Sequence, residues 1–509
     1  MYKLHLILKY LRKRRIAWVS LIAVMLCTTM VLVVISVMGG RLRMFKESFH
    51  GLSGDIIVHG ESLAGFPDYQ EMIDELEKRP EITAVVPTIE TFGLININDL
   101  QKAGVVVIGY PIDQIGKVNR FPQSLFRQYQ QYLDDAESGT HTPAEREKLR
   151  QDAAWHAQHP TFDLPLSPDT YQSLQPNAVK LGIDPATYPG MIMGSGVLGI
   201  HKEKDGQDMV RPERLYELWV KLLVLPISGD KAPTNLEQDK TEKTFWIVDD
   251  SRTKIWQNDR QSVYIPFDVA QKMLGMDEHH YTDADTGQPA VDPARTRDLQ
   301  VDVKPGVSLQ AAKQVVELIV EGVQSKREQA AIAAGHPLEE SYPIDVETWE
   351  ESQQTFITAI EHEKVLVTVL FSLISVVAIF LIFCIFYMIV VEKTKDIGII
   401  KSVGATSSGV AGIFLGYGLA IGVCGGFMGL LLGYLIVHNI NFLHTEMGKL
   451  LGIQIWNPEV YAFDTIPNTM DPREVTIIVG IAVISSVLGA LVPAIRAASM
   501  NPVEALRFE

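Results

Sequence analysis

Four long apolar segments constrain the fold of this chain more than any other feature of its sequence. A helix that crosses a bilayer needs roughly 20 apolar residues, because each residue adds about 1.5 Å along the axis. Each segment has about this length, and none contains Asp, Glu, Lys or Arg. Ion-driven carriers commonly place such residues within the membrane, which disfavours that class. We therefore predict four transmembrane helices, at residues 16–38, 365–391, 410–436 and 475–493.

The distribution of charge orients these spans. Residues 1–15 carry six basic side chains and no acidic one, and such segments stay in the cytoplasm. The apolar run that follows is longer than that of a cleaved signal peptide, so we predict that it is kept as the first span. Alternation then places residues 39–363 and the acidic loop 437–474 outside the cytoplasm, and residues 392–409 and 494–509 inside.

The large segment between the first two spans reads as a mixture of strands and helices. β-rich runs alternate with amphipathic helices, such as the one predicted at 67–78 with Pro67 at its start. A similar order of elements returns between residues 260 and 335. We predict an α+β domain that contains a two-part subdomain, residues 50–120 and 260–335, interrupted by a polar helical insertion and a small β subdomain within residues 121–259.

A further helix is predicted to lead directly into the second span. Thr348 occupies the position of an N-cap, and the residues after it read WEESQQTFITAIEHEK. We predict a continuous stalk helix at 348–364, which would transmit motion between the membrane and the α+β domain.

Composition and motifs exclude several functions. The net charge of −16 argues against nucleic acid as a partner, because phosphate binding needs a basic surface. The three cysteines, Cys27, Cys384 and Cys424, all lie in apolar spans and form neither a disulfide framework nor a zinc pattern. No Walker A motif occurs, so we expect no ATP site of the P-loop type in this chain.

Three stretches weakly resemble a metal, a calcium or a nucleophile site, and each has a simpler explanation. His156 and His159 lie in a polar insertion, where such pairs are usually solvated. The stretch from His279 resembles a calcium loop through Asp283 and Asp285 but lacks the glutamate at the twelfth position. Ser195 is not in a G-x-S-x-G motif. We predict no catalytic residue, no metal and no cofactor of its own.

The stretch EKTKDIGIIKSVGAT, residues 392–406, is the only charged interruption between the second and third spans. Its pattern predicts a short helix at the membrane surface that ends at Gly404. We interpret it as a segment that another protein grips, and a merely solvated loop is the alternative. Its apolar side is predicted to contain Ile397, Ile399, Ile400 and Val403, with Glu392, Lys395, Asp396 and Lys401 elsewhere.

The third span is rich in glycines at a spacing of four residues, a pattern that permits close contact between helices. The sequence leaves open whether the partner helix belongs to the same chain or to a second copy. The predicted packing residues are Gly412, Gly416, Gly418, Gly422 and Gly426, and Gly425, Gly429 and Gly433 continue the spacing.

Two motifs resemble the FtsX-like permeases of ABC transporters with the MacB-type four-helix topology. The first is the 392–406 stretch, which is similar to the coupling segment of that family. The second is the C-terminal PAIRAASMNPVEALRFE, and the start of the chain looks most like LolC and LolE, the lipoprotein-releasing branch. The resemblance implies coupling roles for Glu392, Lys395, Asp396, Ile397, Gly398, Ile399, Lys401, Gly404 and Ala405.

The resemblance implies a permease subunit of the bacterial inner membrane that works by mechanotransmission. ATP would be bound by a separate LolD-like ATPase, a second permease chain would complete a homo- or heterodimer, and the α+β domain would be a MacB-like periplasmic core domain. The cargo would be a lipoprotein or another hydrophobic molecule, passed from the membrane lipid to a periplasmic carrier. Alternatives are a MacB-like exporter of peptides, toxins or macrolides, and an FtsX-like regulator of cell-wall hydrolases. Residues 121–190 match nothing in the lipoprotein-releasing branch.

Overall fold

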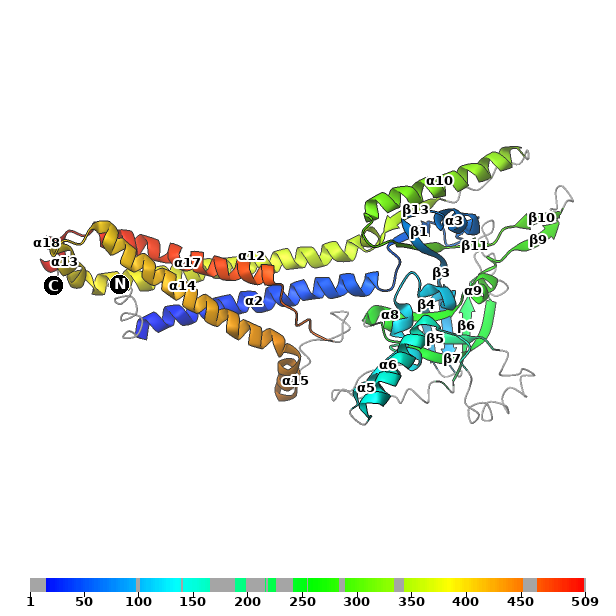
Figure 1. The fold of residues 1–509 in the computed structure, drawn as a ribbon, viewed down its shortest axis with the longest axis horizontal. Helices are drawn as coiled ribbons and strands as arrows, with labels where there is room; N and C mark the ends of the chain where they lie inside the picture. Colours follow the sequence, from blue (N-terminus) through cyan, green and yellow to red (C-terminus); the bar gives the residue numbers. More distant parts are fainter. Residues whose placement is uncertain are drawn as a thin grey trace. The chain divides into compact units, whose positions relative to one another are not determined.

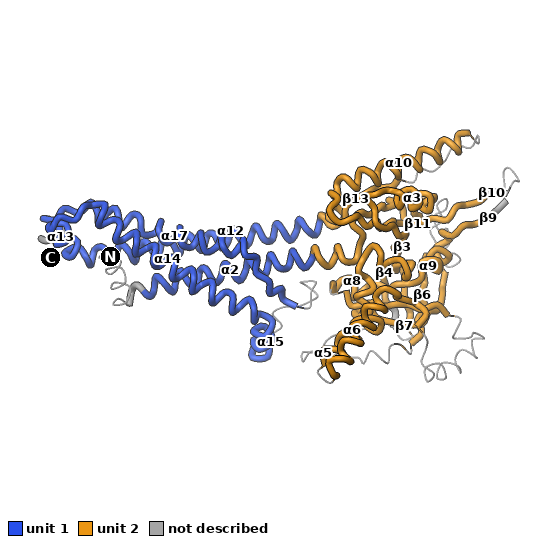
Figure 2. Tube along the Cα trace, viewed as in Figure 1, with its two compact units in different colours: residues 1–45, 355–457, 465–509 blue, residues 46–354, 458–464 orange. Residues whose placement is uncertain are grey.

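The computed structural model describes residues 15–97, 101–138, 141–164, 188–197, 216, 218–225, 241–253, 255–282, 289–333, 343–451 and 465–507. The chain divides into two compact units, coloured separately in Figure 2. The membrane unit comprises Met1–Phe45, Thr355–Asn457 and Thr465–Glu509, and the α+β unit comprises Lys46–Gln354 and Pro458–Asp464. The basic N-terminus predicted at 1–15 lies almost wholly outside the described residues.

The membrane unit is built on four long helices, which confirms the predicted class of a four-span membrane protein with a large α+β domain. Each helix is long and apolar enough to cross a bilayer. The predicted apolar segments fall within the helices, but the helices extend beyond them (Figure 1). The four are α2 (Arg15–His50), α12 (Gln354–Glu392), α14 (Ser407–His438) and α17 (Pro472–Ser499), the last continuing through Pro493.

Glycines on two sides of α14 bring it close to two neighbouring helices of the same chain. On one side, a Cβ added to Gly422 would lie 2.9 Å from Ser486 Cβ of α17. The Ser486 hydroxyl donates a hydrogen bond of 2.8 Å to the Gly418 carbonyl. On the other side, a Cβ on Gly429 would lie 2.8 Å from Met25 O of α2. These close approaches are made within the chain, whereas Gly412 and Gly416 are only half-buried.

The α+β unit is organised around a nine-stranded sheet in the order β13-β1-β12-β3-β4-β8-β5-β7-β6. The strand β3 is unusually long and pairs with β12 through its first half and with both β4 and β6 through its second half. Six strands therefore close into a barrel, β3-β4-β8-β5-β7-β6, which returns to β3. The strands are β1 (Ile56–Gly60), β3 (Ile82–Ile97), β4 (Gln101–Tyr110), β5 (Gly190–Gly194), β6 (Trp219–Val224), β7 (Thr241–Ser251), β8 (Ser262–Pro266), β12 (Asp298–Val303) and β13 (Ile344–Thr348).

The hydrophobic residues of this unit form two main cores that share β3. The barrel interior is filled by side chains such as Ile95, Leu222 and Phe245, and α9 (Phe267–Leu274) packs against it. The second core lies between the open part of the sheet and two helices, α3 (Tyr69–Leu76) and α10 (Leu309–Ala333). Two further strand pairs complete the strands of the described residues: β2 (Phe66–Pro67) with β11 (Arg295–Thr296), and β9 (His279–Thr282) with β10 (Pro289–Asp292).

This arrangement differs from the predicted subdivision at residues 121 and 259. The β-rich runs expected as a separate subdomain pair directly with β3 and β8, so the sheet is continuous across both boundaries. The prediction of a helix that starts at Pro67 was also wrong, because Pro67 belongs to β2 and α3 begins at Tyr69. The apolar face expected of that helix is present, since Met72, Ile73 and Leu76 are buried.

The polar insertion is helical, as predicted, and it packs on the outside of the barrel. Its elements are η1 (Phe121–Ser124), the π-helix η2 (Phe126–Gln130), α5 (Gln131–Glu137) and α6 (Pro143–Gln158). Phe121 is fully buried, and its ring lies 4.3 Å from that of Tyr264 on β8. The buried Asp249 carboxylate on β7 accepts hydrogen bonds from the backbone amides of Arg127 and Gln128. Burial raises the pKa of Asp249 to about 7. Residues 165–187 of the insertion lie outside the described residues.

The predicted stalk begins as expected but is not continuous. Thr348 caps α11 (Trp349–Ser352) in a capping box with Glu351. The helix is interrupted at Gln353, where the backbone has φ −98° and ψ 11°, and α12 starts at Gln354. The prediction of one helix over 348–364 was therefore wrong by this single break. Propensity does not reveal it, because no glycine or proline marks the position.

The Glu351 carboxylate of the capping box also contributes to the stability of the α+β unit in a pH-dependent way. Glu351 accepts a hydrogen bond of 2.8 Å from Lys313 on α10 and another from the Thr348 amide. These two interactions, led by the one with Lys313, lower the pKa of Glu351 to about 2. A carboxyl whose pKa is depressed in the folded state stabilises the fold above its ordinary pKa of 4.5 and loses that effect as the pH falls toward 2.

We therefore expect Glu351→Gln to flatten the decline in stability between about pH 4.5 and 2. Thermal unfolding at a series of pH values checks this. Glu317→Gln, on the more distant partner of Lys313 at 3.8 Å, is the control and should leave the profile unchanged. Equal acid sensitivity of the Glu351→Gln and unaltered proteins would contradict the assignment.

Candidate functional site

The segment between the second and third spans forms a short helix with a defined stop. It is α13 (Thr394–Ser402), which follows α12 after Lys393. Gly404 has φ +105°, a conformation that residues with a side chain rarely adopt, and it turns the chain toward α14. Thr406 then caps α14, because its hydroxyl accepts a 3.2 Å hydrogen bond from the Gly409 amide. Helix α13 thus ends at Ser402, two residues before the predicted stop, and Gly404 supplies the turn that follows it.

The apolar residues of α13 divide into an inward and an outward set, so the predicted single apolar side was wrong. Ile397 and Gly398 are buried, and Ile397 packs with Val390 of α12 and Ala497 of α17. In contrast, Ile399 is 52% exposed and Val403 is 85% exposed. These two are four residues apart and share one face of the helix. Ile397 and Ile399 are two residues apart, about 200° around a helix, so helical geometry itself places them on opposite sides.

The polar residues of α13 connect it to the C-terminal part of the chain. Lys401 donates hydrogen bonds of 2.8 and 2.6 Å to the carbonyls of Ala498 and Met500, at the end of α17. Lys401 is thereby a structural link as well as a predicted coupling residue. Lys393 pairs with Asp396 one turn along, while Glu392 and Lys395 are exposed. Ala405 packs beside Ile397.

A second short helix, α18 (Pro502–Arg507), packs against α13. Its Val503 is 72% exposed. The two sequence motifs, about 100 residues apart, therefore meet at one end of the membrane unit (Figure 1). The sequence does indicate that the two motifs lie at the same membrane face, because they follow the second and fourth spans, which cross the bilayer in the same direction. We call the exposed residues Ile399, Val403 and Val503, with the charged α13 side chains around them, the α13–α18 surface.

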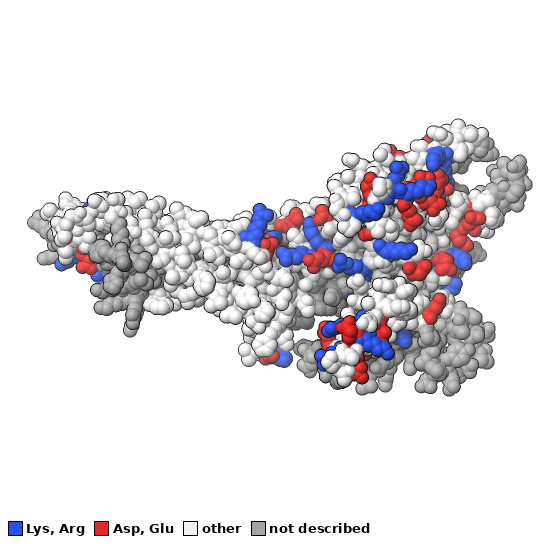
Figure 3. All heavy atoms as spheres, viewed as in Figure 1, with Lys and Arg blue, Asp and Glu red and all other residues white. Residues whose placement is uncertain are grey.

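Three ion pairs join α2, α12 and α17 at the opposite end of the spans, and we call them the ion-pair belt. Arg41 pairs with Glu363 at 2.9 Å, Arg43 with Asp471 at 3.4 Å, and Lys364 with Glu474 at 2.6 Å. On the face shown in Figure 3, the middle of the membrane unit carries no charged side chain. The belt and the α13–α18 surface thus mark the two polar ends of the membrane-crossing part.

The Lys364–Glu474 pair should contribute measurably to holding α12 against α17, because both side chains are partly buried. In a double-mutant cycle of Lys364→Gln and Glu474→Gln we expect a coupling free energy of about 0.5–1 kcal/mol. Unfolding of the purified protein in micelles measures it. The exposed pair Lys449–Glu446, at 3.2 Å, serves as the control and should couple more weakly. Equal coupling in the two cycles would contradict a role for the belt.

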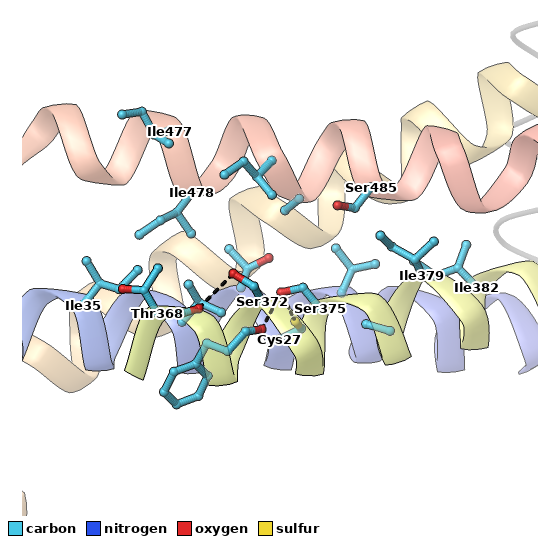
Figure 4. Close-up of a pocket in the computed structure, with 17 residues that line it drawn as sticks. Cys27, Ile35, Thr368, Ser372, Ser375, Ile379, Ile382, Ile477, Ile478 and Ser485 are labelled. Atoms are coloured by element: carbon cyan, nitrogen blue, oxygen red, sulfur yellow. Dashed lines mark hydrogen bonds between the residues drawn. The ribbon is translucent and has the colours of Figure 1, made fainter. Parts of the chain in front are cut away.

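A cavity of about 200 Å³ lies between α2, α12 and α17. Its walls are mostly apolar, with a row of hydroxyl groups along α12 (Figure 4). Ser372 and Ser375 donate their hydrogen bonds to carbonyls one turn earlier in α12, so both are satisfied within the helix. The Cys27 thiol faces Ser375 at 3.7 Å. The cavity can therefore hold hydrocarbon but offers no charged group to a polar ligand.

The weaker chemical signals in the sequence do not assemble into a site. Among the described residues, no three His, Cys, Asp or Glu side chains are placed to hold a metal ion. His156 stacks on Tyr132 and bonds to its hydroxyl at 3.2 Å, and His159 stacks on Trp155. Ser195 follows β5 and bonds through its amide to Ser251. Asp283 and Asp285 lie outside the described residues.

Comparison with known proteins gives a family match over the second, third and fourth spans, without α2. The family described as "FtsX-like permease C-terminal" matches residues 368–502. LolC of Neisseria meningitidis serogroup B, a lipoprotein-releasing system transmembrane protein, is 32% identical over 164 residues, which is 32% of this chain and 40% of that protein. LolE of Haemophilus influenzae is 29% identical over 119 residues, 23% of this chain and 29% of that protein.

These matches leave much of the chain without a counterpart. The chain spans about 40% of the length of the curated LolC proteins that it matches. Among solved structures, the chain matches the periplasmic region of MacB from Actinobacillus actinomycetemcomitans. The match covers 60% of this chain and 94% of the MacB chain, with 10% sequence identity and a TM-score of 0.25. That score is too low to assign the fold of the α+β unit, so its likeness to the MacB core domain stays a prediction.

Proposed function

We propose that this chain is the permease subunit of an ABC transporter for lipoprotein release. The premise is that residues 368–502 form an FtsX-like permease domain similar to the corresponding part of LolC and LolE. The observation that carries the proposal is the α13–α18 surface. It presents Ile399, Val403 and Val503 to solvent beside charged side chains. An exposed apolar centre with a polar rim is typical of a protein-binding surface.

The occupant of this surface is an ATPase subunit. The 509 residues contain no Walker A motif, and we assign ATP hydrolysis to a separate ATPase subunit. Ile397 packs α13 against α12 and α17, and Lys401 ties it to the end of α17. A movement imposed on α13 is therefore transmitted to both helices at once, which is the property that a coupling helix needs.

The charge distribution supports an orientation with the α13–α18 surface in the cytoplasm. Five of the six basic residues of the N-terminus precede α2 and the sixth, Arg15, begins it, and all six are expected on the same side as the α13–α18 surface. Both termini are then cytoplasmic, and the α+β unit lies outside. The site of action is the inner membrane of a bacterium, where the ATPase has access to cytoplasmic ATP.

The proposed cargo is an acylated protein, because its release requires an energy source. Moving an acyl chain out of the bilayer costs about 0.8 kcal/mol per CH₂ group. Desorption of a protein with several chains is therefore slow without ATP. The apolar cavity between α2, α12 and α17 is suited to hydrocarbon. Helix α12 is continuous over 39 residues from Gln354 to Glu392, so force applied at α13 can travel along it. A second permease chain completes the transporter.

Purification of the full chain from its native membrane, followed by mass spectrometry, tests this proposal. We expect an ABC-type ATPase and a second permease chain in stoichiometric amounts, and lipoprotein transfer to a soluble carrier that depends on ATP. Copurification with an outer-membrane tunnel protein would instead favour the MacB-like exporter. A sample that binds cell-wall hydrolases and releases no lipoprotein would favour the FtsX-like regulator. Nucleotide hydrolysis by the isolated chain would overturn the proposal.

A further inference from the structure

The loop predicted outside the membrane at 437–474 contains a helix that the sequence analysis did not anticipate. It is α15 (Ile440–Leu451), which begins two residues after α14 ends at His438. None of its residues is buried. Leu443, Met447 and Leu450 follow one another at i, i+4 and i+7 and so lie on one face. Leu450 is 84% exposed, the highest value among the apolar residues of this helix.

Contacts around the start of α15 fix its level relative to the spans. Val437, at the end of α14, packs with Leu32 of α2 and Ile478 of α17. Ile478 lies four residues from Glu474 of the ion-pair belt, which is about 6 Å along a helix. The turn into α15 is therefore within about one helical turn of the charged end of the spans.

A second set of contacts gives the same level independently. The Asn441 amide group donates to the Ile466 carbonyl at 3.0 Å and its oxygen accepts from the Ile466 amide at 2.9 Å. The next residue, Pro467, rests on Gly40 of α2, where an added Cβ would lie only 2.6 Å from it. Gly40 directly precedes Arg41 of the belt. Both sets of contacts place the first turn of α15 at the border between the apolar and the charged surface of the membrane unit.

We propose that α15 is an interfacial helix that inserts its apolar face into the outer leaflet of the bilayer. The occupant of this face is lipid, because α14 crosses the membrane and ends at the level where acyl chains meet headgroups. A helix with one apolar and one polar face lies in the plane of that boundary. Thr445 and Lys449 lie on the side of the helix opposite Met447, next to Phe442, and Lys449 pairs with Glu446 at 3.2 Å. The inference depends on the four spans and, for the choice of leaflet, on the orientation proposed above; it does not depend on the cargo or the ATPase.

Spin labels on the two faces of α15 test the proposal in the full chain. Leu450→Cys and the matched Thr445→Cys are made in a background of Cys27→Ser, Cys384→Ser and Cys424→Ser. Each protein is labelled and reconstituted into vesicles of phosphatidylethanolamine and phosphatidylglycerol. Power saturation then measures access of oxygen, which concentrates in lipid, and of a nickel chelate, which stays in water.

We expect the ratio of oxygen to nickel access to be several-fold higher at position 450 than at position 445. High nickel access at both positions would place α15 in water and overturn the proposal. Low access of both reagents at position 450 would mean that protein covers this face, which also overturns it. An unchanged thermal transition relative to the unlabelled protein shows that each variant is folded. Failure of ATPase binding or lipoprotein release would leave this readout unaffected.

Discussion

A Val403→Asp protein is expected to fold, insert into the membrane and lose its ATPase. Val403 is 85% exposed, so a carboxylate at this position displaces no packed neighbour. At the centre of an apolar contact, however, the same carboxylate must be desolvated without a partner. Central interface residues cost about 2 kcal/mol or more when they are lost, which is about 30-fold in affinity. Binding of the ATPase that copurifies with the unaltered chain, measured in nanodiscs, gives the result.

Val291→Asp is the matched control for this experiment. It makes the same chemical change at an exposed position, 52% accessible, on β10 of the α+β unit. This variant should bind the ATPase with unchanged affinity. ATPase binding by Val403→Asp equal to that of the control would remove the α13–α18 surface from the coupling mechanism. It would leave the membrane topology unaffected.

A Gly422→Ala substitution is expected to destabilise the membrane unit, whereas Gly426→Ala, one turn away on the same helix, is expected to be tolerated. The added methyl at 422 would lie 2.9 Å from Ser486 Cβ and 3.0 Å from Val483 Cα. The backbone of α17 must move to admit it, and overpacking of this kind costs about 1–3 kcal/mol. At 426 the nearest atom, Val479 Cγ1, is 3.6 Å away, which is ordinary contact.

Unfolding of the two variants in mixed micelles, with the same protein concentration and lipid content, measures the difference. Alanine is also the better helix former, by about 1 kcal/mol, so Gly426→Ala should be neutral or slightly more stable than the original. The two substitutions are thus expected to have opposite signs. If both variants lost the same stability, close packing of α14 against α17 at Gly422 would not be the reason for the glycine at that position.

The parts of this fold that depend on local sequence were predictable. An uncharged run of about 20 residues has few alternatives to a membrane span. The turn at Gly404 follows from the backbone freedom of glycine, and Thr348 was identified as a cap from its place before an acidic turn. In each case the residues that decide the structure are neighbours in the chain.

The parts that sequence reasoning missed depend on contacts between distant residues. Closure of the barrel requires β3 to pair with β6, whose residues follow more than 120 positions later. Lys401 was predicted to lie off the apolar side of this helix, with a coupling role implied by the resemblance, but its bonds to the carbonyls of Ala498 and Met500 were not foreseen. Ile397 and Ile399 must lie on opposite sides of α13, but which of the two is buried depends on the neighbours of the helix. No property of the local sequence records these partners.

The long strand β3 has a consequence for how the α+β unit responds to load. Because one continuous stretch of backbone, Ile82 to Ile97, belongs to both hydrophobic cores, neither core can loosen without disturbing the other. If the barrel tilted against the open part of the sheet, β3 would have to bend or lose hydrogen bonds to its neighbouring strands. The unit should therefore move as a stiff body and melt in a single calorimetric step.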